Sequence, residues 1–185
     1  MDCDGIRVRK GVLADAGLLA EMGAATFYDS YVDQIEARVL ADFVAEVFGL
    51  EKQAAELADP ASCFLLAERE GQAVGYARLL WDETPEAVGG KQPPERQRAL
   101  ELQRIYARKA WIGRGVGAAL MRACLDEARV QGCEMMWLGV WERNARAIRF
   151  YEKWGFEVVG EQAFHMGEEV QRDLLMRAHL SLTHN

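Results

Sequence analysis

The most constraining feature of this sequence is residues 105–121, IYARKAWIGRGVGAALM, which predict a strand, a glycine-rich turn and the start of a helix. Gly113, Gly115 and Gly117 leave the turn almost without side-chain bulk, so that backbone N–H groups can point into one concavity. The positive end of the helix and the Arg114 side chain add to the attraction for an anion. This segment therefore predicts an anion site, and we expect the pyrophosphate of a nucleotide-like cofactor as its ligand.

Two other interpretations of the turn stay open at this point. The spacing Gly113-x-Gly115-x-x-Ala118 also satisfies the dinucleotide fingerprint G-x-G-x-x-G/A. That fingerprint normally follows the first strand of a parallel sheet, whereas several strands are expected before it here, and Glu142 supplies the usual acidic residue only loosely. The other alternative is a glycine turn that serves close packing alone. The P-loop pattern is absent, because no Gly-Lys-Ser/Thr follows.

The composition favours a single globular domain over the 185 residues. Half of the sequence is hydrophobic and 28% is charged, which is enough apolar material for a full core. The net charge is −7 and the sequence pI is about 5.1, so nucleic acid is not an expected partner.

The cysteines and the termini point to an ordinary intracellular protein. The four cysteines include no C-x-x-C pair, and we expect reduced thiols, although an even count leaves disulfides open. No His/Cys cluster has ligand spacing, so no metal is expected. Neither a signal-like apolar stretch nor a membrane-length run is present, which predicts a cytoplasmic protein with no membrane partner.

Hydrophobic periodicity predicts an α/β fold with a mixed sheet of six to seven strands flanked by helices. A hairpin is expected around Arg69-Glu70-Gly71-Gln72, and a long flexible loop over 82–98. The expected helices cover 14–25, 36–48, 51–58, 115–130 and 144–154. The expected strands cover 6–9, 63–68, 73–81, 99–107, 134–141, 156–159 and 170–180.

Two features of this order matter for topology. The strand, helix and strand over 99–141 predict a central parallel βαβ unit. The last strand is expected to run antiparallel after a turn at Gly167, and a free strand edge near the C-terminus is compatible with a homodimer.

A second constellation, WLGVWERNARAIRFYEKWGF over 137–156, gives the chain a resemblance to the GNAT superfamily of acetyl-CoA-dependent N-acetyltransferases. Gly115-x-Gly117 resembles the pyrophosphate loop of that family, Q/R-x-x-G-x-G/A. Ile112 departs from this pattern, because it stands where the family has Gln or Arg. The second family motif, N-x-x-A-x-x-x-Y-x-x-x-G-F, is matched by Asn144, Ala147, Tyr151, Gly155 and Phe156.

Longer strings resemble the PaiA-type polyamine acetyltransferases within that superfamily. They are TFYDSY at 26–31, ELQRIY at 101–106, WLGVWERN at 137–144 and FHMGEEVQRDLLM at 164–176. The resemblance implies a GNAT-like single domain over 1–185, with acetyl-CoA as co-substrate.

The resemblance also implies a set of cofactor-binding residues. The end of the strand near Ile105 is expected to pair with pantetheine amides, and a backbone N–H there is expected to hold the thioester oxygen. Lys153 is either a phosphate contact or a solvated helix lysine. The full set is Ile105, Tyr106, Ala107, Ile112, Gly113, Arg114, Gly115, Val116, Gly117, Ala118, Asn144, Ala147, Tyr151 and Lys153.

Tyr151 and Glu101 are the candidate catalytic side chains. The phenol of Tyr151 can protonate the leaving thiolate, and its alternative role is aromatic packing under the helix. Glu101 is the leading candidate for the base that deprotonates the amine. Its alternative roles are a solvated edge charge or a partner for Arg104. His165 is the histidine expected on the acceptor side.

The acceptor is expected to contact Phe27, Tyr28, Asp29 and Tyr31, with Asp33 and Glu36 close by in sequence. Carboxylates there would take the positive charges of a polyamine and rings would cover its methylenes. The alternative is a charged loop at a helix entry, fixed by aromatic contacts.

The function that we expect is transfer of acetyl from acetyl-CoA to a primary amine by direct attack in a ternary complex, with a small-molecule polyamine favoured. Acetylation of protein N-termini or lysines, and a non-catalytic acetyl-CoA-binding regulator, are the alternatives.

Overall fold

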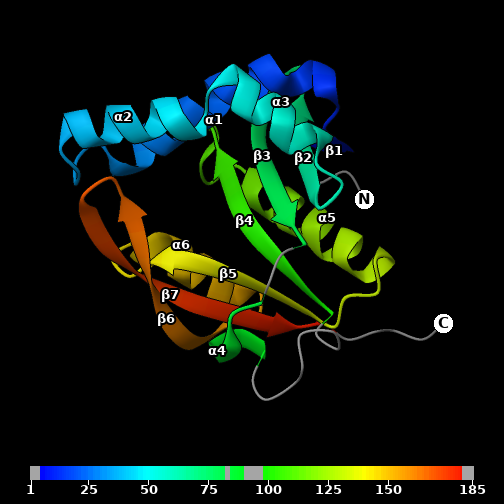
Figure 1. Cartoon of the computed structure of the whole chain (residues 1–185). Coiled ribbons are helices and arrows are strands. Elements are labelled where there is room, and N and C mark those ends of the chain that lie inside the picture. The colour runs from blue at the N-terminus through cyan, green and yellow to red at the C-terminus, as the bar shows by residue number, and fades with distance from the viewer. Residues whose placement is uncertain (1–4, 82–83, 90–97, 181–185) are drawn as a thin grey trace. The chain divides into compact units, whose positions relative to one another are not determined.

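A computed structural model describes residues 5–81, 84–89 and 98–180 (Figure 1). Its strands form one seven-stranded sheet in the order β1-β2-β3-β4-β5-β7-β6. Their bounds are Arg7–Lys10, Ser62–Arg69, Gln72–Leu80, Ala99–Ala107, Met135–Trp141, Glu157–Met166 and Glu169–His179 for β1 to β7. The mixed α/β fold predicted from the sequence is thereby confirmed.

Two strand pairings define the topology. β4 and β5 run parallel, with Ala99 opposite Met135 and Glu101 opposite Trp137, as the βαβ prediction requires. β7 runs antiparallel to both β5 and β6. β7 lies between these two strands, so the edge strand at this end of the sheet is β6. The C-terminal strand β7 is therefore an interior strand of the sheet.

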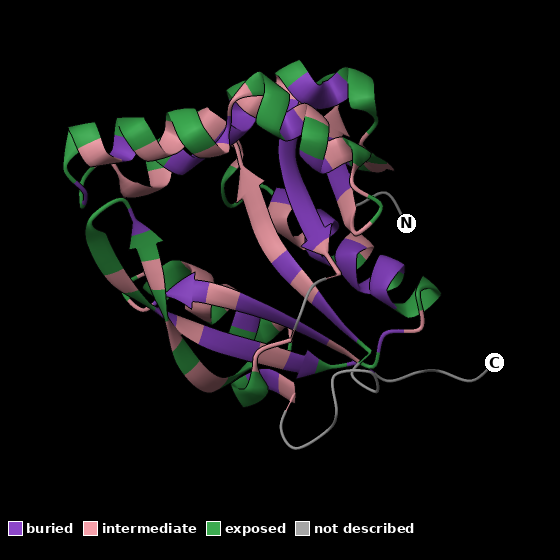
Figure 2. Cartoon of the chain, viewed as in Figure 1, coloured by how far each residue is buried: buried purple, intermediate pink, exposed green. Residues whose placement is uncertain are grey.

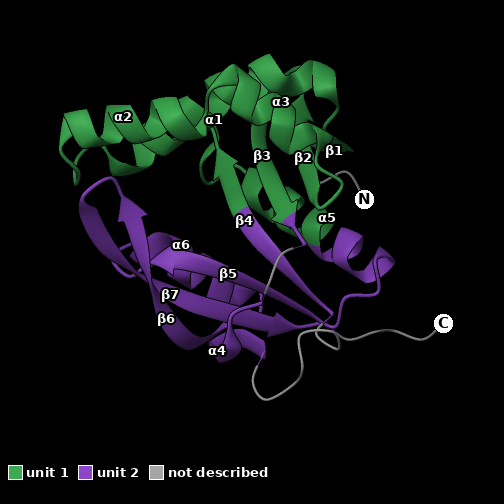
Figure 3. Cartoon of the chain, viewed as in Figure 1, with its two compact units in different colours: residues 1–79, 104–124 green, residues 80–103, 125–185 purple. Residues whose placement is uncertain are grey.

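The chain divides into two compact units, which Figure 3 colours separately. Unit 1 holds residues 1–79 and 104–124, and unit 2 holds residues 80–103 and 125–185. The strand β4 and the helix α5 (Val116–Val130) contribute residues to both.

Unit 1 is built on β1 to β3 and on three helices, α1 (Ala16–Tyr31), α2 (Ala37–Val47) and α3 (Leu50–Ala58). A short 3₁₀ turn, η1 (Leu13–Asp15), precedes α1. β2 and β3 are buried in continuous runs rather than in alternation (Figure 2), which is typical of strands covered on both faces. Its core contains Leu19, Met22, Phe64, Leu66 and Tyr76.

The prediction that the first helix ends at residue 25 is wrong, because α1 continues to Tyr31. Thr26 and Ser30 are residues that often favour irregular backbone, but here their hydroxyls donate hydrogen bonds within the helix. Thr26 donates to the Met22 carbonyl at 2.8 Å, and Ser30 donates to the Thr26 carbonyl at 2.8 Å. Phe27 and Tyr31 also pack together one turn apart, with ring centroids 4.5 Å apart.

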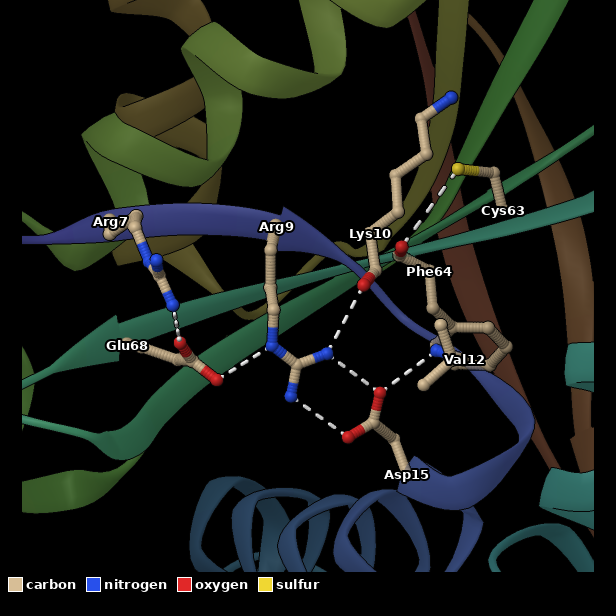
Figure 4. A network of polar contacts seen from close by, with 8 residues as sticks. All are labelled: Arg7, Arg9, Lys10, Val12, Asp15, Cys63, Phe64 and Glu68. Carbon is tan, nitrogen blue, oxygen red and sulfur yellow. Dashed lines mark hydrogen bonds and ion pairs between the residues drawn. The ribbon is translucent and has the colours of Figure 1, made fainter.

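A charged network ties the N-terminal strand to this helix (Figure 4). The Arg9 guanidinium donates to both Asp15 oxygens, at 2.7 and 2.9 Å, and to Glu68 at 2.7 Å. Asp15 also accepts the Val12 N–H at 2.8 Å. These bonds lower the pKa of Asp15 and of Glu68, so their contribution to stability is present above pH 4 to 5 and is lost as the pH falls further.

Unit 2 joins β5, β6, β7 and the first part of β4 to α4 (Glu86–Gly89) and α6 (Ala145–Lys153). Val88, Ala99, Trp137 and Leu175 form one core cluster on it. The predicted strand 156–159 extends to Met166, past a bulge between Val158 and Gly160.

The loop predicted over 82–98 lies largely outside the described residues, which resume at 84–89 and again at residue 98. Its described part contains the short helix α4. The turn at Gly167, with a φ of 60°, connects β6 to β7 as predicted.

Candidate functional site

The glycine-rich turn lies in unit 1, between β4 and α5. After a short 3₁₀ turn, η3 (Lys109–Trp111), Gly113 and Gly115 take φ values of 78° and 84°, a left-handed backbone that favours glycine. α5 then begins at Val116, so Gly117 and Ala118 lie in its first turn, where N–H groups have no partner within the helix. Because Ile112, Gly113 and Arg114 are exposed, this turn has the geometry of an anion site.

Gly75 on β3 allows this turn to pack closely, and the sequence prediction did not include it. A Cβ at Gly75 would lie 2.6 Å from the Tyr106 carbonyl oxygen and 2.6 Å from a methyl group of Val116. Any larger residue would push on both the end of β4 and the start of α5. Its sequence signal is an isolated glycine inside a strand pattern, which often marks close backbone approach.

Two guanidinium groups flank Trp111 beside the turn. The Arg114 Cζ lies 5.7 Å from the ring centroid, and the Arg69 Cζ, from the end of β2, lies 5.3 Å from it. Residues 102–125 contain five Arg or Lys and no Asp or Glu, in a chain whose net charge is −7. Arg104 and Arg108 pair with carboxylates, so the positive charge beside the turn comes from Lys109, Arg114 and Arg69, whose Nε lies 3.9 Å from Glu70. No local pattern points to Arg69, because it is distant in sequence.

Arg108 and Arg104 have structural partners. Arg108 donates to Glu21 at 2.7 and 3.0 Å and to the Ala73 carbonyl at 3.1 Å, which raises its pKa. Arg104 makes a bidentate pair with the buried Glu56 of α3, at 2.7 and 3.0 Å. Glu56 is thus a carboxylate partner of Arg104.

The end of β4 packs on an aromatic cluster in unit 1. Tyr106 stacks on Tyr76 with centroids 5.9 Å apart and meets Phe27 edge-on at 6.4 Å. Phe27, predicted to contact the acceptor, is 6% exposed and also stacks on Phe43 at 5.1 Å. Phe27 is a core residue, which corrects the expectation of an irregular loop here. Tyr28 and Asp29 are exposed on α1, and Tyr31 is half-buried.

The second motif builds α6 in unit 2. Asn144 is its N-cap, since its side-chain oxygen accepts the Ala147 N–H at 3.1 Å. Tyr151 is buried, with its ring 5.5 Å from that of Phe150 and 5.9 Å from that of Phe156. The motif therefore has a folding role in addition to any role toward the cofactor.

The remaining candidates in unit 2 do not gather in one place. Lys153 is exposed in the last turn of α6, where its positive charge interacts favourably with the negative end of the helix dipole. Glu101 is half-buried on β4 opposite Trp137. His165 is exposed on β6 opposite Val170. Side chains alternate between the two faces along each paired strand, so the register places His165 on the sheet face opposite to that of Glu101.

Three other properties of the described residues bear on chemistry. Cys63, Cys124 and Cys133 are free thiols, and burial raises the pKa of Cys124 and Cys133. Within the same residues, no three His, Cys, Asp or Glu side chains are grouped to hold a metal ion. Nor does any described helix have the length and apolar character needed to span a membrane.

A mixed sheet whose parallel strand runs into an exposed, cationic glycine turn defines a class of proteins that bind phosphate-bearing cofactors. The family model of the acetyltransferase (GNAT) family matches residues 25–156, and the chain belongs to this family. It is an N-acetyltransferase that uses acetyl-CoA as co-substrate.

Known proteins agree with this assignment. An uncharacterized N-acetyltransferase of Mycobacterium tuberculosis is 32% identical over 89% of this chain and 97% of that protein. A spermine/spermidine N(1)-acetyltransferase of Bacillus subtilis is 30% identical over 55% of this chain and 62% of that protein. The PaiA N-acetyltransferase of Thermoplasma acidophilum, solved with coenzyme A, shares the fold, with a TM-score of 0.72 at 18% identity over 94% of this chain and 98% of that chain.

Proposed function

We propose that this N-acetyltransferase acetylates a small polyamine, as a PaiA-type enzyme whose 185 residues act as one domain. The observation that carries the proposal is the sequence match to the spermine/spermidine N(1)-acetyltransferase of Bacillus subtilis, which is partial in length. The acidic character of the chain, with a net charge of −7, suits a polycationic acceptor.

The described surface of α1 and the residues after it supply groups that suit such an acceptor. Tyr28 and Asp29 are exposed on α1, and Asp33 and Glu36 are exposed just beyond its end. We assign the carboxylates to the ammonium groups and the Tyr28 ring to the methylenes between them. Phe27 contributes indirectly, because its packing in the core fixes the last turns of α1.

We assign the phosphates of acetyl-CoA to the turn over residues 112–118. The N–H groups of the turn and of the first turn of α5, together with Arg114 and Arg69, give an anion its donors and its charge. Backbone groups of Ile105, Tyr106 and Ala107 are assigned to the pantetheine arm. The side-chain amide of Asn144 and the ammonium of Lys153 are further candidates for the cofactor.

The reaction transfers the acetyl group in one step within a ternary complex. The amine loses a proton to Glu101, directly or through water, and its nitrogen attacks the thioester carbonyl carbon. A backbone N–H near Ile105 holds the oxygen as it becomes negative. The carbon–sulfur bond breaks, Tyr151 protonates the thiolate, and the second proton released by the nitrogen restores the phenol.

CoA release from acetyl-CoA, measured with spermidine, spermine, a lysine peptide and a peptide with a free N-terminus, tests the acceptor class. We expect saturable release with the polyamines and a kcat/KM at least 10-fold higher for them than for the peptides. A higher kcat/KM for either peptide would replace the polyamine by a protein acceptor. Tight acetyl-CoA binding without release from any amine would favour a regulator instead.

A further inference from the structure

Asp173 on β7 is a buried carboxylate outside the proposed catalytic and cofactor-binding residues. The residue is 9% exposed. Among the residues that the structure describes, none makes a hydrogen bond or an ion pair with the Asp173 carboxylate. Desolvation by burial raises its pKa. Burying an unpaired carboxylate is costly for a folded protein, so its retention points to a cationic ligand.

The Asp173 side chain has room over β5 because that strand carries a glycine there. A Cβ at Gly139 on β5 would lie 3.3 Å from the Asp173 Oδ2 and 3.0 Å from the Gln162 Nε2. The side chains of Asp173 and Gln162 therefore lie over Gly139, from β7 and from β6. Any other residue at 139 would press against both of these polar groups.

Aromatic residues flank this glycine along β5. Trp137 and Trp141 lie two positions before and after Gly139, on the same face of the sheet because side chains alternate along a strand. They are 5% and 7% exposed. Trp137 packs in the core cluster with Val88, Ala99 and Leu175. The Trp141 ring already attracts a cation, because the Arg143 Cζ lies 5.9 Å from its centroid.

The register places Asp173 on the same face as Glu101. Glu101 lies opposite Trp137, and Trp141 lies opposite Asp173. Four residues along β5 and two strand spacings across the sheet separate the two carboxylates, which corresponds to roughly 16 Å between their backbones. A linear polyamine carries ammonium groups at comparable separations.

We infer that Asp173 binds an ammonium group of the amine acceptor, on the sheet face that it shares with Glu101, Gly139 and Trp141. This inference rests on the proposed polyamine acetyltransferase function and adds a specificity-determining residue to it. The carboxylate accepts hydrogen bonds from the ammonium group, and the Gln162 side chain, next to it, offers a neutral polar contact.

The ionisation of Asp173 then sets a lower pH limit for acceptor binding. Burial raises its pKa to about 6, so the carboxylate is charged at neutral pH and protonated below that value. The other charged or titratable groups that the register puts on this face are Glu101, Glu157, Glu169, Arg177 and His179. Arg143 lies over the Trp141 ring, and Glu86 belongs to α4, which packs against β6 and β7. Arg177 is held by the Val88 carbonyl at 2.7 Å and by Glu157 at 3.1 Å.

The test is Asp173→Asn, which keeps the shape of the side chain and removes its charge. We expect kcat/KM for spermidine to fall about 10-fold or more, with the Kd for CoA unchanged. The fall of kcat/KM below pH 6 disappears in this variant. Its Tm at pH 7.5 rises, because an unpaired buried charge is gone, whereas a purely structural residue would lower it.

Two further variants complete the design. Gly139→Ala keeps the charge but fills the space beside it, and we expect it also to lower kcat/KM for spermidine. Glu169→Gln removes an exposed carboxylate from the same strand and serves as the matched control. Loss with spermidine but not with n-butylamine supports the inference, because Asp173 lies roughly 16 Å from Glu101 and therefore contacts an ammonium group other than the reacting one. Equal loss with n-butylamine contradicts it.

The inference is overturned if Asp173→Asn behaves like Glu169→Gln while the wild type acetylates spermidine. In that case the polyamine function stands without it. If the wild type acetylates only peptides and binds no polyamine to its CoA complex by calorimetry, the proposed function fails, and the inference for polyamines fails with it.

Discussion

At the scale of single residues, Tyr151 carries the largest catalytic claim. The side chain is buried between two aromatic rings in unit 2, so the phenol is held in place by packing. A phenylalanine at this position would fill the same space without the hydroxyl, so replacing Tyr151 by Phe separates a catalytic role from a packing role.

We predict that Tyr151→Phe lowers kcat by roughly 100-fold or more, since proton transfer by a positioned side chain contributes about that much. The Kd for acetyl-CoA by calorimetry and the near-UV CD spectrum should stay close to wild type. A variant that keeps its kcat would assign Tyr151 to packing and leave the thiolate to be protonated by solvent.

Residues of this kind also show what the sequence can and cannot reveal. Gly113, Gly115 and Asn144 were predictable, because a turn glycine and a helix cap act within a few residues of their own position. Arg69, Gly75 and Asp173 were not, because they become candidates only through their positions beside Trp111, Val116 and Gly139, which strand pairing and packing bring about.

At the scale of elements, the glycine turn over residues 112–118, to which we assign the phosphates, has possible donors from two segments. Glycines with left-handed backbone orient the turn, and Arg69 comes to it from the end of β2. The proposed phosphate site therefore includes a positive charge from outside the turn and its motif.

Arg69→Gln is predicted to raise the KM for acetyl-CoA about 10-fold, the typical effect of losing one hydrogen bond to a charged group, with little change in kcat. Arg122→Gln removes an exposed cation from α5 and is the control for net charge. Equal KM values for the two variants would show that Arg69 packs on Trp111 without serving the phosphates.

Element boundaries were predictable where hydrophobic periodicity was undisturbed. The strand over 99–107 and the helices around residues 37–47 and 50–58 agree with the structure to within about one residue. The end of α1 was missed because Thr26 and Ser30, residues that favour turns, bond back into the helix. β6 was predicted too short, because a bulge at Val158 and Gly160 interrupts its alternation.

At the scale of the whole molecule, family membership establishes the reaction class and the co-substrate, whereas the acceptor depends on carboxylates from several elements. Exposed Asp29 on α1, half-buried Glu101 on β4 and buried Asp173 on β7 differ in their surroundings. Our central proposal is a polycationic acceptor, which explains why Glu101 and Asp173 share one sheet face in unit 2.

The most direct measurement is a competition in one vessel. The enzyme receives acetyl-CoA with equal concentrations of spermidine, a lysine peptide and a peptide with a free N-terminus, and mass spectrometry follows which of the three gains an acetyl group. We predict that acetylspermidine forms first and predominates by at least 10-fold during the initial linear phase. Predominant acetylation of either peptide would contradict the polyamine assignment and make this enzyme a protein acetyltransferase.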